Sequence, residues 1–369
     1  MNKESKGQNE ICVVGTFPPP VNGMALANFH LVNLLIDSHF SVTVFNTSPI
    51  NSQSVIKKHL SRLVRFIKAW HFIIIRRKDL AGVYISLSGG LGLIYDVVTV
   101  FICKLLNIRC ALHHHGWAYF SRKRTMLTII AKISNSFAMH VVLCREMGRR
   151  LNNLYKVTRY ITLSNIIFIY KNAKNYNIEQ LQNTPYNIGM LSNLTREKGT
   201  EQFIKLAYMS KEKALPFKYI LAGPCHDVTL LKQIHRAINA KVISWKGPLY
   251  GAEKTAFFQN IDIFVFPTSY RFEAEPLVIW EALNGGSPVI STNRGCISEQ
   301  VGKAGVVIPA GDSNSDFIKE ALGVLTKWTS NNKCWINVAA EATKRPETMY
   351  KSSITSWSHI IEYFSGKEV

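Results

Sequence analysis

Short apolar runs alternate with longer amphipathic stretches along this chain, and the alternation predicts β-strands separated by helices. The first run, Ile11–Gly15, ends at a glycine and precedes a proline-rich turn and a helical pattern over Met24–Ile36. The later strand-like runs of this half are Val42–Phe45, Gly82–Ile85, Ala111–His114 and His140–Leu143. Alternating strands and helices predict a parallel sheet with crossover helices.

The rhythm restarts after a polar, asparagine-rich stretch, Tyr170–Asn187, which we interpret as an interdomain linker. We expect a second sheet from Asn187–Leu191, Lys218–Ala222, Lys241–Trp245, Ile263–Phe266, Pro288–Ser291 and Gly305–Ile308. The predicted organisation is a Rossmann-like domain over residues 1–169, a linker over 170–186, a second Rossmann-like domain over 187–348, and a final helix within 349–369. Two such α/β halves predict a ligand site in a cleft between them, at the carboxyl ends of the strands.

Composition narrows the class of protein. The 369 residues suffice for two domains that bury their own cores. Seven cysteines are scattered without a CxxC pair, which indicates neither a zinc knuckle nor a disulfide framework and fits reduced thiols in a cytoplasm. Met1–Glu10 is polar, so we expect no secretory signal. Leu91–Leu106 is interrupted by Asp96 and Lys104 and is too short to span a bilayer, so we expect no transmembrane helix.

The charge is unevenly distributed. The chain carries a net charge of +20, and its first 170 residues hold 21 Lys and Arg against 6 Asp and Glu. Such a field attracts nucleic acid, anionic lipid headgroups or a pyrophosphate-linked acceptor.

One basic segment of this half, Lys57–Lys78, has helical periodicity. Its apolar positions are Ile56, Leu60, Leu63, Val64, Ile67 and Trp70. Its cationic positions are Lys57, Lys58, Arg62, Arg65 and Lys68. The pattern predicts one apolar and one cationic face, and it suits both a helix lying on an anionic membrane and an internal helix with a solvated charged face.

The motif with the clearest chemistry lies in the second half. Glu273 and Glu281 are separated by seven residues, with Pro276 and a helix start between them. A carboxylate can accept two hydrogen bonds from vicinal ribose hydroxyls, and a helix start at Pro276 and Leu277 offers amides to phosphates. An ordinary surface helix with acidic residues in its first turns has the same local pattern.

The residues around this motif resemble a known family. Phe266-Pro-Thr-Ser-Tyr270, the Glu-x7-Glu motif and the Gly-x-Pro-Val-Ile that follows are similar to the donor-binding block of retaining glycosyltransferases of family 4 with the GT-B fold. The resemblance is specific over about 45 residues and extends loosely over most of the chain. It implies that Glu281 binds the donor ribose, that Glu273 lies near the transferred sugar, and that Ala274, Glu275, Pro276 and Leu277 line the donor site.

A second part of the resemblance lies after the linker. Leu191-Ser-Asn-Leu-Thr-Arg-Glu-Lys198-Gly199 is similar to the family's strand, loop and Lys-Gly segment, which implies that Lys198 contacts the donor diphosphate. An ammonium suits that place because the leaving group gains charge in the transition state. Asn193 stands where the family often has arginine, and Arg196 is the nearby substitute that we assign to the donor site. A solvated lysine at a helix start would show the same sequence.

The first half contributes weaker matches. The loop Pro18–Gly23 resembles the family's glycine-rich loop near the phosphates, which places Asn22 and Gly23 at the site. His113-His-His115-Gly resembles the His-x-His-Gly at which the family's first domain meets donor sugar and acceptor. Strand alternation puts His113 and His115 on one face and His114 on the other. We assign His115, with Lys198 and Glu273, to the catalytic site. Three histidines can also bind a metal, but adjacent strand positions cannot all converge on one ion.

The resemblance therefore implies a hexosyltransferase-type glycosyltransferase (EC 2.4). It would move a sugar from a nucleotide-sugar donor to a glycan or glycolipid acceptor in lipopolysaccharide, capsule or exopolysaccharide assembly. We expect no cofactor, no divalent metal and no nucleic-acid partner, and a cytoplasmic location, either free or peripheral on an anionic membrane surface. The alternatives are a small soluble acceptor, a basic nucleic-acid-binding protein, and a non-catalytic relative suggested by Asn193.

Overall fold

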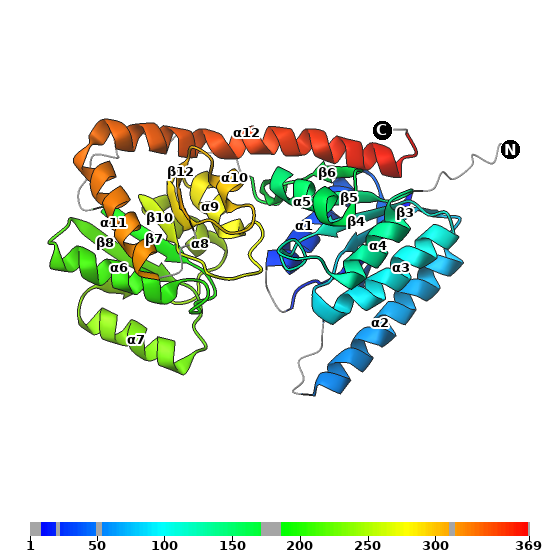
Figure 1. The fold of residues 1–369 in the computed structure, drawn as a ribbon, viewed down its shortest axis with the longest axis horizontal. Coiled ribbons are helices and arrows are strands. Elements are labelled where there is room, and N and C mark those ends of the chain that lie inside the picture. Colours follow the sequence, from blue (N-terminus) through cyan, green and yellow to red (C-terminus); the bar gives the residue numbers. More distant parts are fainter. Residues whose placement is uncertain (1–8, 20–22, 49–53, 171–185, 310–313, 368–369) are drawn as a thin grey trace. The chain divides into compact units, whose positions relative to one another are not determined.

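The protein is described by a computed structural model covering residues 9–19, 23–48, 54–170, 186–309 and 314–367. The chain divides into two compact units (Figure 1). Unit 1 comprises Met1–Phe168 together with Ser352–Val369, and unit 2 comprises Ile169–Lys351.

Unit 1 contains a six-stranded sheet of order β2-β1-β3-β4-β5-β6, in which every neighbouring pair is parallel. Its strands are β1 (Glu10–Gly15), β2 (Ser41–Asn46), β3 (Leu80–Ser86), β4 (Cys110–His114), β5 (Met139–Val142) and β6 (Tyr160–Thr162). Its helices are α1 (Gly23–Asp37), α2 (Val55–Ile75), α3 (Leu93–Leu105), α4 (Thr125–Ser134) and α5 (Arg145–Tyr155). Strands β3, β4 and β5 are buried along their whole length, as expected for a parallel sheet covered on both faces.

Unit 2 contains a second parallel sheet, of order β12-β11-β10-β7-β8-β9. Its strands are β7 (Tyr186–Leu191), β8 (Phe217–Ala222), β9 (Ile243–Trp245), β10 (Ile263–Phe266), β11 (Val289–Thr292) and β12 (Gly305–Ile308). Its helices are α6 (Thr200–Glu212), α7 (Val228–Asn239), α8 (Gly251–Asn260), α9 (Leu277–Asn284), α10 (Ile297–Val301), α11 (Asn314–Ser330) and the first part of α12 (Asn332–Phe364). Successive strands extend outward from β7 in one direction and from β10 in the other, so the topological switch point lies between these two strands.

The predicted parallel α/β fold class is confirmed, and the eleven predicted strands all occur. Two elements differ from the sequence predictions. Strand β6, which has three residues at the edge of its sheet, was not predicted. The last helix begins at Asn332 and not near Met349, because Pro346 is accommodated inside α12 and does not mark its start. Among helices formed by described residues, none combines the length and apolar composition needed to cross a membrane.

Helix α2 turns most of its predicted apolar side outward and part of its predicted cationic side inward. The residues that it buries are Phe66, Ala69 and Ile73. Arg62 donates to Ser88 Oγ (2.9 Å) and Arg65 donates to the carbonyl of Ser48, so two members of the predicted cationic face turn inward. The alternative of an internal helix with a solvated charged face is wrong at Arg62 and Arg65, because periodicity separates apolar from charged positions but cannot tell that the loops beside a helix offer acceptors to arginine.

The end of α12 packs against the sheet of unit 1. An added Cβ at Gly82 in β3 would lie 2.4 Å from the Phe364 ring, so this strand needs glycine for the helix to approach. The hydroxyl of Tyr363 accepts a hydrogen bond from the Cys110 amide (3.0 Å) and donates to the carbonyl of Phe137 (2.8 Å). A single buried hydroxyl thus ties the C-terminal helix to β4 and to the turn before β5.

Tyr363→Phe should lower the free energy of unfolding of unit 1 by about 1–3 kcal/mol, because it leaves the buried Cys110 amide without this acceptor. Urea unfolding of the full chain measures the change. Tyr350→Phe in the same helix is the matched control, since its ring keeps its stacking on Tyr170. Equal effects of the two variants would contradict a specific role for the Tyr363 hydroxyl.

Candidate functional site

The switch point of unit 2 brings together two segments that the sequence separates by about seventy residues. Lys198 lies in the loop after β7, next to Gly199, the N-cap of α6. Gly199 has φ +89°, and an added Cβ would lie 2.2 Å from the Pro267 carbonyl oxygen, so glycine is required for this loop to lie against the segment after β10. The amide of Ser269 also donates to the Glu197 carbonyl (2.7 Å). These backbone contacts fix Lys198 opposite Glu273.

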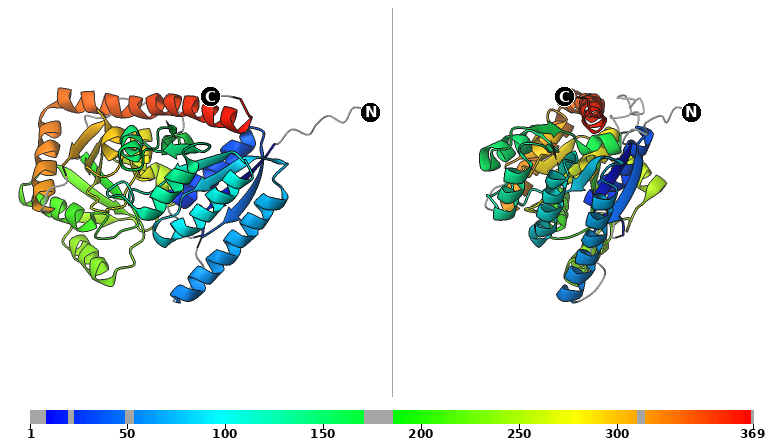
Figure 2. Two further views of the ribbon diagram at one scale, coloured as in Figure 1. Left: turned by 45° about the vertical axis from the view of Figure 1, so that its right-hand side comes forward. Right: turned by 90° about the vertical axis from the view of Figure 1, so that its right-hand side faces the viewer.

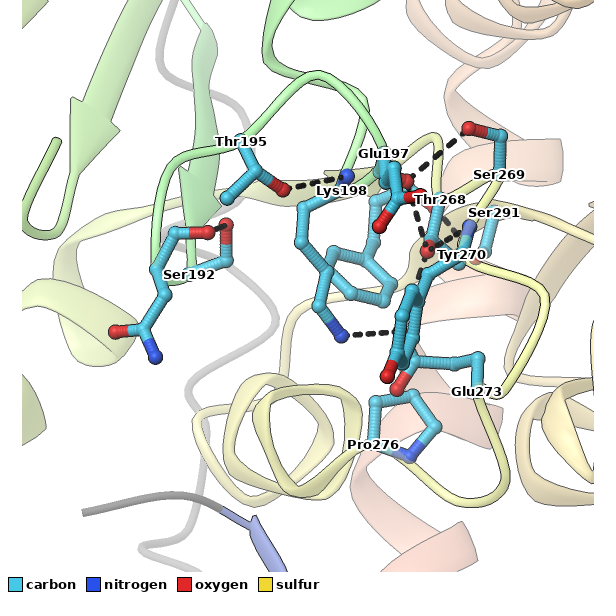
Figure 3. A network of polar contacts seen from close by, with 12 residues as sticks. Ser192, Thr195, Glu197, Lys198, Thr268, Ser269, Tyr270, Glu273, Pro276 and Ser291 are labelled. Atoms are coloured by element: carbon cyan, nitrogen blue, oxygen red, sulfur yellow. Dashed lines mark hydrogen bonds and ion pairs between the residues drawn. The ribbon is translucent and has the colours of Figure 1, made fainter. Parts of the chain in front are cut away.

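Lys198 and Glu273 form an ion pair in the ligand-free protein. Lys198 Nζ lies 2.6 Å from Glu273 Oε2, and the Glu273 side chain is only 9% exposed. Thr268 Oγ1 lies 3.2 Å from the same carboxylate oxygen. The ammonium also stands 4.7 Å from the centroid of the Tyr270 ring, within the range of a cation–π contact. Figure 3 shows the Lys198 side chain running beside Tyr270 toward Glu273.

Glu281 lies on α9 and is half engaged. Its Oε1 is 2.6 Å from Lys254 Nζ on α8, whereas its buried Oε2 has no hydrogen-bond partner among the described residues. A buried carboxylate oxygen without a donor is costly unless a ligand supplies one. This carboxylate is therefore held in place by Lys254 with one acceptor oxygen to spare.

The residues between the two glutamates are mostly committed to the local fold. Glu275 is buried and accepts a hydrogen bond from Trp280 Nε1 (3.1 Å). The Ala274 carbonyl accepts from the Cys296 amide (2.7 Å), and the Pro276 carbonyl accepts from Gln300 Nε2 (2.9 Å). No side chain caps the N-terminus of α9 at Pro276 and Leu277, so its first amides remain a site suited to an anion. Among residues 274–277, the backbone amides at the start of α9 are therefore better placed than the Glu275 side chain to bind a ligand.

Arg196 does not join the Lys198–Glu273 pair. Its guanidinium donates to Thr229 Oγ1 (2.6 Å) and lies 3.5 Å from Asp227 and 3.6 Å from Glu201. These partners belong to α6 and to the N-terminus of α7. The structure thus directs Arg196 to a neighbouring helix, and Asn193 is exposed in the same loop.

The histidines of unit 1 separate as strand alternation predicts. The rings of His113 and His115 lie 3.8 Å apart between centroids, and His113 Nδ1 is 2.8 Å from the Tyr84 hydroxyl. On the other face, His114 Nε2 is 2.9 Å from His140 Nδ1, and His140 Nε2 is 2.8 Å from Ser134 Oγ. The His113–His115 face keeps unpaired ring nitrogens, because Nε2 of both residues has no described partner.

Burial keeps these imidazoles neutral. Desolvation lowers the pKa of His115 and of His140 to about 3. It also lowers the pKa of His113 and His114 well below their usual value, with neighbouring histidines adding to the effect. Within the described part of the chain no three His, Cys, Asp or Glu side chains gather as a metal site would require. The Nε2 atoms of His113 and His115 can therefore donate or accept hydrogen bonds as parts of neutral rings.

The glycine-rich loop contributes little that can be described. Asn22 lies outside the described residues. Gly23 is the first residue of α1, and an added Cβ there would meet no atom within 4 Å. Packing within the protein therefore does not demand a glycine at this position.

Sequence reasoning missed two polar groups. Lys254 belongs to α8, and its sequence context gave no sign that it pairs with Glu281. Asp96 was noted only as an interruption of an apolar stretch, which was the available signal. It is fully buried at the start of α3 and accepts a hydrogen bond from the Ser88 amide (2.7 Å). Burial raises the pKa of Asp96 to about 7, although that hydrogen bond and the nearby Arg62 oppose the shift.

Comparison with known proteins finds a family model that matches most of unit 2. Residues 171–339 match the family model described as glycosyl transferases group 1, a span that includes Lys198, Glu273 and Glu281. A curated relative, an uncharacterized 42.6 kDa protein in the cps region of Klebsiella pneumoniae, is 32% identical over 115 residues. That alignment covers 30% of this chain and 27% of the relative, so the chain spans about a quarter of that protein's length.

Solved structures extend the likeness to the whole chain. HepE from Anabaena, in complex with UDP, has a TM-score of 0.69 at 17% identity, covering 97% of this chain and 100% of HepE. Sucrose-phosphate synthase from Thermosynechococcus elongatus has a TM-score of 0.70 at 14% identity, covering 97% and 100%. WaaG, a glycosyltransferase involved in lipopolysaccharide biosynthesis, has a TM-score of 0.65 at 12% identity, covering 97% and 99%. The fold is that of GT-B proteins, with two Rossmann-like α/β domains, and with the family match it supports a glycosyltransferase.

The Lys198–Glu273 pair should behave as an energetic unit. Lys198→Met and Glu273→Gln should each lower the free energy of unfolding by about 1–3 kcal/mol, because each leaves a partly buried charge unpaired. The double variant should lose less than the sum, by about 1 kcal/mol, in chemical denaturation. Lys351→Met is the matched control, since its pair with Glu347 has the same 2.6 Å distance at an exposed position, and no measurable change is expected. Additive losses would mean that the pair is not coupled.

The buried histidines should make the fold sensitive to acid. In the unfolded chain these histidines have a pKa of about 6.5, whereas in the native protein His115 and His140 have a pKa of about 3. Between these two pH values the unfolded chain therefore binds protons that the native protein does not bind. Stability should therefore be present above pH 6.5 and fall as the pH drops. Asp96 acts in the opposite sense, because its raised pKa favours the native state at low pH and this contribution is lost as the pH rises through about 7.

His140→Gln isolates one of these histidines. It should flatten the slope of unfolding free energy between pH 6 and pH 4 by up to about 1.4 kcal/mol per pH unit, measured by urea unfolding at each pH. Measurements at pH 8, where the histidine is neutral in both states, give the packing cost alone. Parallel curves for the variant and the wild type would show that His140 titrates normally in the folded protein.

Proposed function

We propose that this protein is a retaining glycosyltransferase of family 4 that transfers a sugar from a nucleotide-sugar donor to a glycan or lipid-linked oligosaccharide. The observation that carries the proposal is the half-engaged carboxylate of Glu281. Its Oε2 atom is buried and has no hydrogen-bond partner among the described residues, and Glu281 lies on the helix that follows the switch-point strand β10. That is the place in a doubly wound sheet where nucleotides bind.

Each donor group has a matching protein group. Glu281 Oε2 can accept from a ribose hydroxyl, the uncapped start of α9 can donate amides to phosphate oxygens, and Lys198 can neutralise the diphosphate. Lys198 is occupied by Glu273 before the donor arrives, so the diphosphate must compete with a carboxylate for the ammonium. As the glycosidic bond breaks, negative charge grows on the leaving diphosphate, and the pairing of Lys198 with phosphate strengthens.

Retention of configuration is the expected stereochemical course. The leaving phosphate can itself take the acceptor proton on the face from which it departs, so a dedicated base is not required. Glu273 then acts beside the transferred sugar as the partner that positions Lys198. On the acceptor side, the unpaired Nε2 atoms of His113 and His115 are suited to hydrogen bonds with sugar hydroxyls because both rings are neutral. The proposed reaction uses no cofactor and no divalent metal.

The comparisons support the choice of substrates. The HepE structures contain UDP, glucose or UDP-glucose, which favours a uridine diphosphate sugar as the donor. The relative from a cps region and the likeness to WaaG favour an acceptor in surface polysaccharide or lipopolysaccharide assembly. A cytoplasmic location is part of the proposal. A small soluble acceptor is the second candidate for the same donor chemistry.

Calorimetric titration with UDP, GDP, ADP, CMP and their common sugar conjugates tests the donor site. One nucleotide should bind, and Glu281→Ala should weaken it at least tenfold, roughly 1.4 kcal/mol, because the ribose loses its acceptor. Lys254→Ala should cause a smaller loss, since it frees the carboxylate without removing it. Glu320→Ala, an exposed glutamate on α11 of the same unit, is the control and should bind like the wild type. Unchanged affinity in Glu281→Ala would remove its ribose role.

Once a donor is identified, the anomeric configuration of the product settles the stereochemical course. Proton NMR of the transferred sugar should show the configuration of the donor. Inversion would overturn the retaining mechanism while leaving the donor site intact. Absence of nucleotide binding, together with steep salt-dependent binding of RNA, would instead favour a nucleic-acid-binding protein.

A further inference from the structure

The outward side of α2 is apolar and exposed. Ile56 is 79% exposed and Leu60 is 60% exposed, and four further aliphatic side chains along the helix are also exposed: Val64, Ile67, Ile74 and Ile75. Successive members are mostly three, four or seven residues apart, a spacing that keeps them on one side of a helix. We call these six residues the α2 stripe. A single exposed leucine is ordinary, but six large aliphatics along one 21-residue helix need an explanation.

Helix α3 carries a second set of the same kind. Ile94, Phe101 and Leu105 are exposed and lie seven and then four residues apart, so they share one face. The two helices lie side by side within unit 1 (Figure 2). They are joined by the stacked rings of Phe66 and Tyr95 and by the hydrogen bond from Trp70 Nε1 to Thr99 Oγ1. Leu91, just before α3, is also exposed. Exposed apolar side chains therefore occur along both α2 and α3.

The fold of unit 1 does not need the α2 stripe. Its inner side is already filled by Phe66, Ala69 and Ile73, which are fully buried. Arg62 and Arg65 meet the loops after β3 and β2 on the inner side. The stripe is thus left over after the helix has satisfied its intramolecular contacts.

The charges around the stripe select the kind of partner. Helix α2 contains no acidic residue, and the exposed Lys57 and Lys68 lie next to stripe members in sequence. Arg77 and Lys78 follow the helix and are also exposed. A second copy of this face would bring like charges together, which opposes a self-association through α2. The set of aliphatic side chains bordered by lysine is the composition that interfacial helices present to anionic lipid.

We propose that the α2 stripe, together with the exposed side chains of α3, binds an anionic lipid surface. Helix α2 is about 30 Å long at 1.5 Å per residue, and it would lie in the plane of the headgroups with Ile56, Leu60 and Ile67 in the acyl boundary. Lys57 and Lys68 would stay at the level of the phosphates, their stems covering apolar surface. The proposal rests on unit 1 alone and is independent of the donor site proposed in unit 2.

Sedimentation of the full chain with vesicles tests the proposal. The protein should bind vesicles of phosphatidylcholine with 30% phosphatidylglycerol at least tenfold more tightly than phosphatidylcholine alone. Leu60→Asn with Ile67→Asn should lower the affinity for anionic vesicles at least tenfold. Lys57→Gln with Lys68→Gln should lower it less and should reduce its dependence on salt. Both pairs are exposed, so the melting temperature and the binding of nucleotide by unit 2 should not change.

Val228→Asn is the matched control, because Val228 is an exposed aliphatic residue on α7 of unit 2, 66% exposed, and should not affect vesicle binding. The proposal is overturned if the wild type stays in the supernatant with anionic vesicles, or if the stripe variant binds them as the wild type does. It is also overturned if the stripe variants convert a dimer to a monomer in analytical ultracentrifugation, since the face would then be covered by a second copy. Loss of nucleotide binding with vesicle binding retained would count against the donor site and not against this surface.

Discussion

Parallel pairing of every strand is the constraint on which the functional residues depend. It forces each connection to cross back over the sheet, so that the carboxyl ends of all strands in a unit lie at one edge. In unit 2 the two loops that flank the switch point, after β7 and after β10, therefore meet whatever their separation in sequence. Lys198 and Glu273 are 2.6 Å apart for this reason, and Gly199 is the residue that lets their backbones come close enough. In unit 1 the same rule places His113 and His114 at the end of β4, next to the loop after β3 that holds Ser88, whose amide donates to Asp96 of α3.

The ligand-free site is electrostatically satisfied, and this has a consequence for binding. Lys198 is neutralised by Glu273, and Glu281 is partly neutralised by Lys254, so neither lysine waits as an isolated charge. In the proposed reaction a dianionic diphosphate would replace Glu273 as the partner of Lys198, so the gain on binding would be smaller than a free ammonium would give. The same exchange would favour a transition state in which the leaving group carries more charge than the bound donor, because phosphate then competes better with the carboxylate. If Lys198 contacts the diphosphate as proposed, these pre-paired charges would favour turnover over tight ground-state binding.

Sequence reasoning reached the fold but not the side-chain contacts around the candidate site. The strands were predictable because fully buried parallel strands are short apolar runs, and the Glu-x7-Glu spacing was visible without coordinates. The His113–His115 pairing followed from strand alternation alone. The contacts that the sequence did not reveal depend on partners distant in sequence: Arg196 turns to Asp227 and Thr229, and Lys254 reaches Glu281 from another helix. Local patterns cannot rank such partners, because several acceptors lie within the reach of a long side chain. The roles of the site residues stay predictions.

Helix α2 shows how partners distant in sequence decide which side of a helix turns inward. Its sequence separates an apolar from a cationic side, and neighbours account for the inward turn of two cationic residues: the loops after β2 and β3 present oxygen acceptors, and arginine satisfies them with planar, directional donors. Because Arg62 and Arg65 point inward, the residues on the opposite side of the helix point outward. The aliphatic side chains of that side therefore lie at the surface. Exposing six of them costs solvation free energy in water. The proposed anionic lipid surface would bury these aliphatic side chains without a shaped groove. It would therefore account for both the α2 stripe and the lysines that border it.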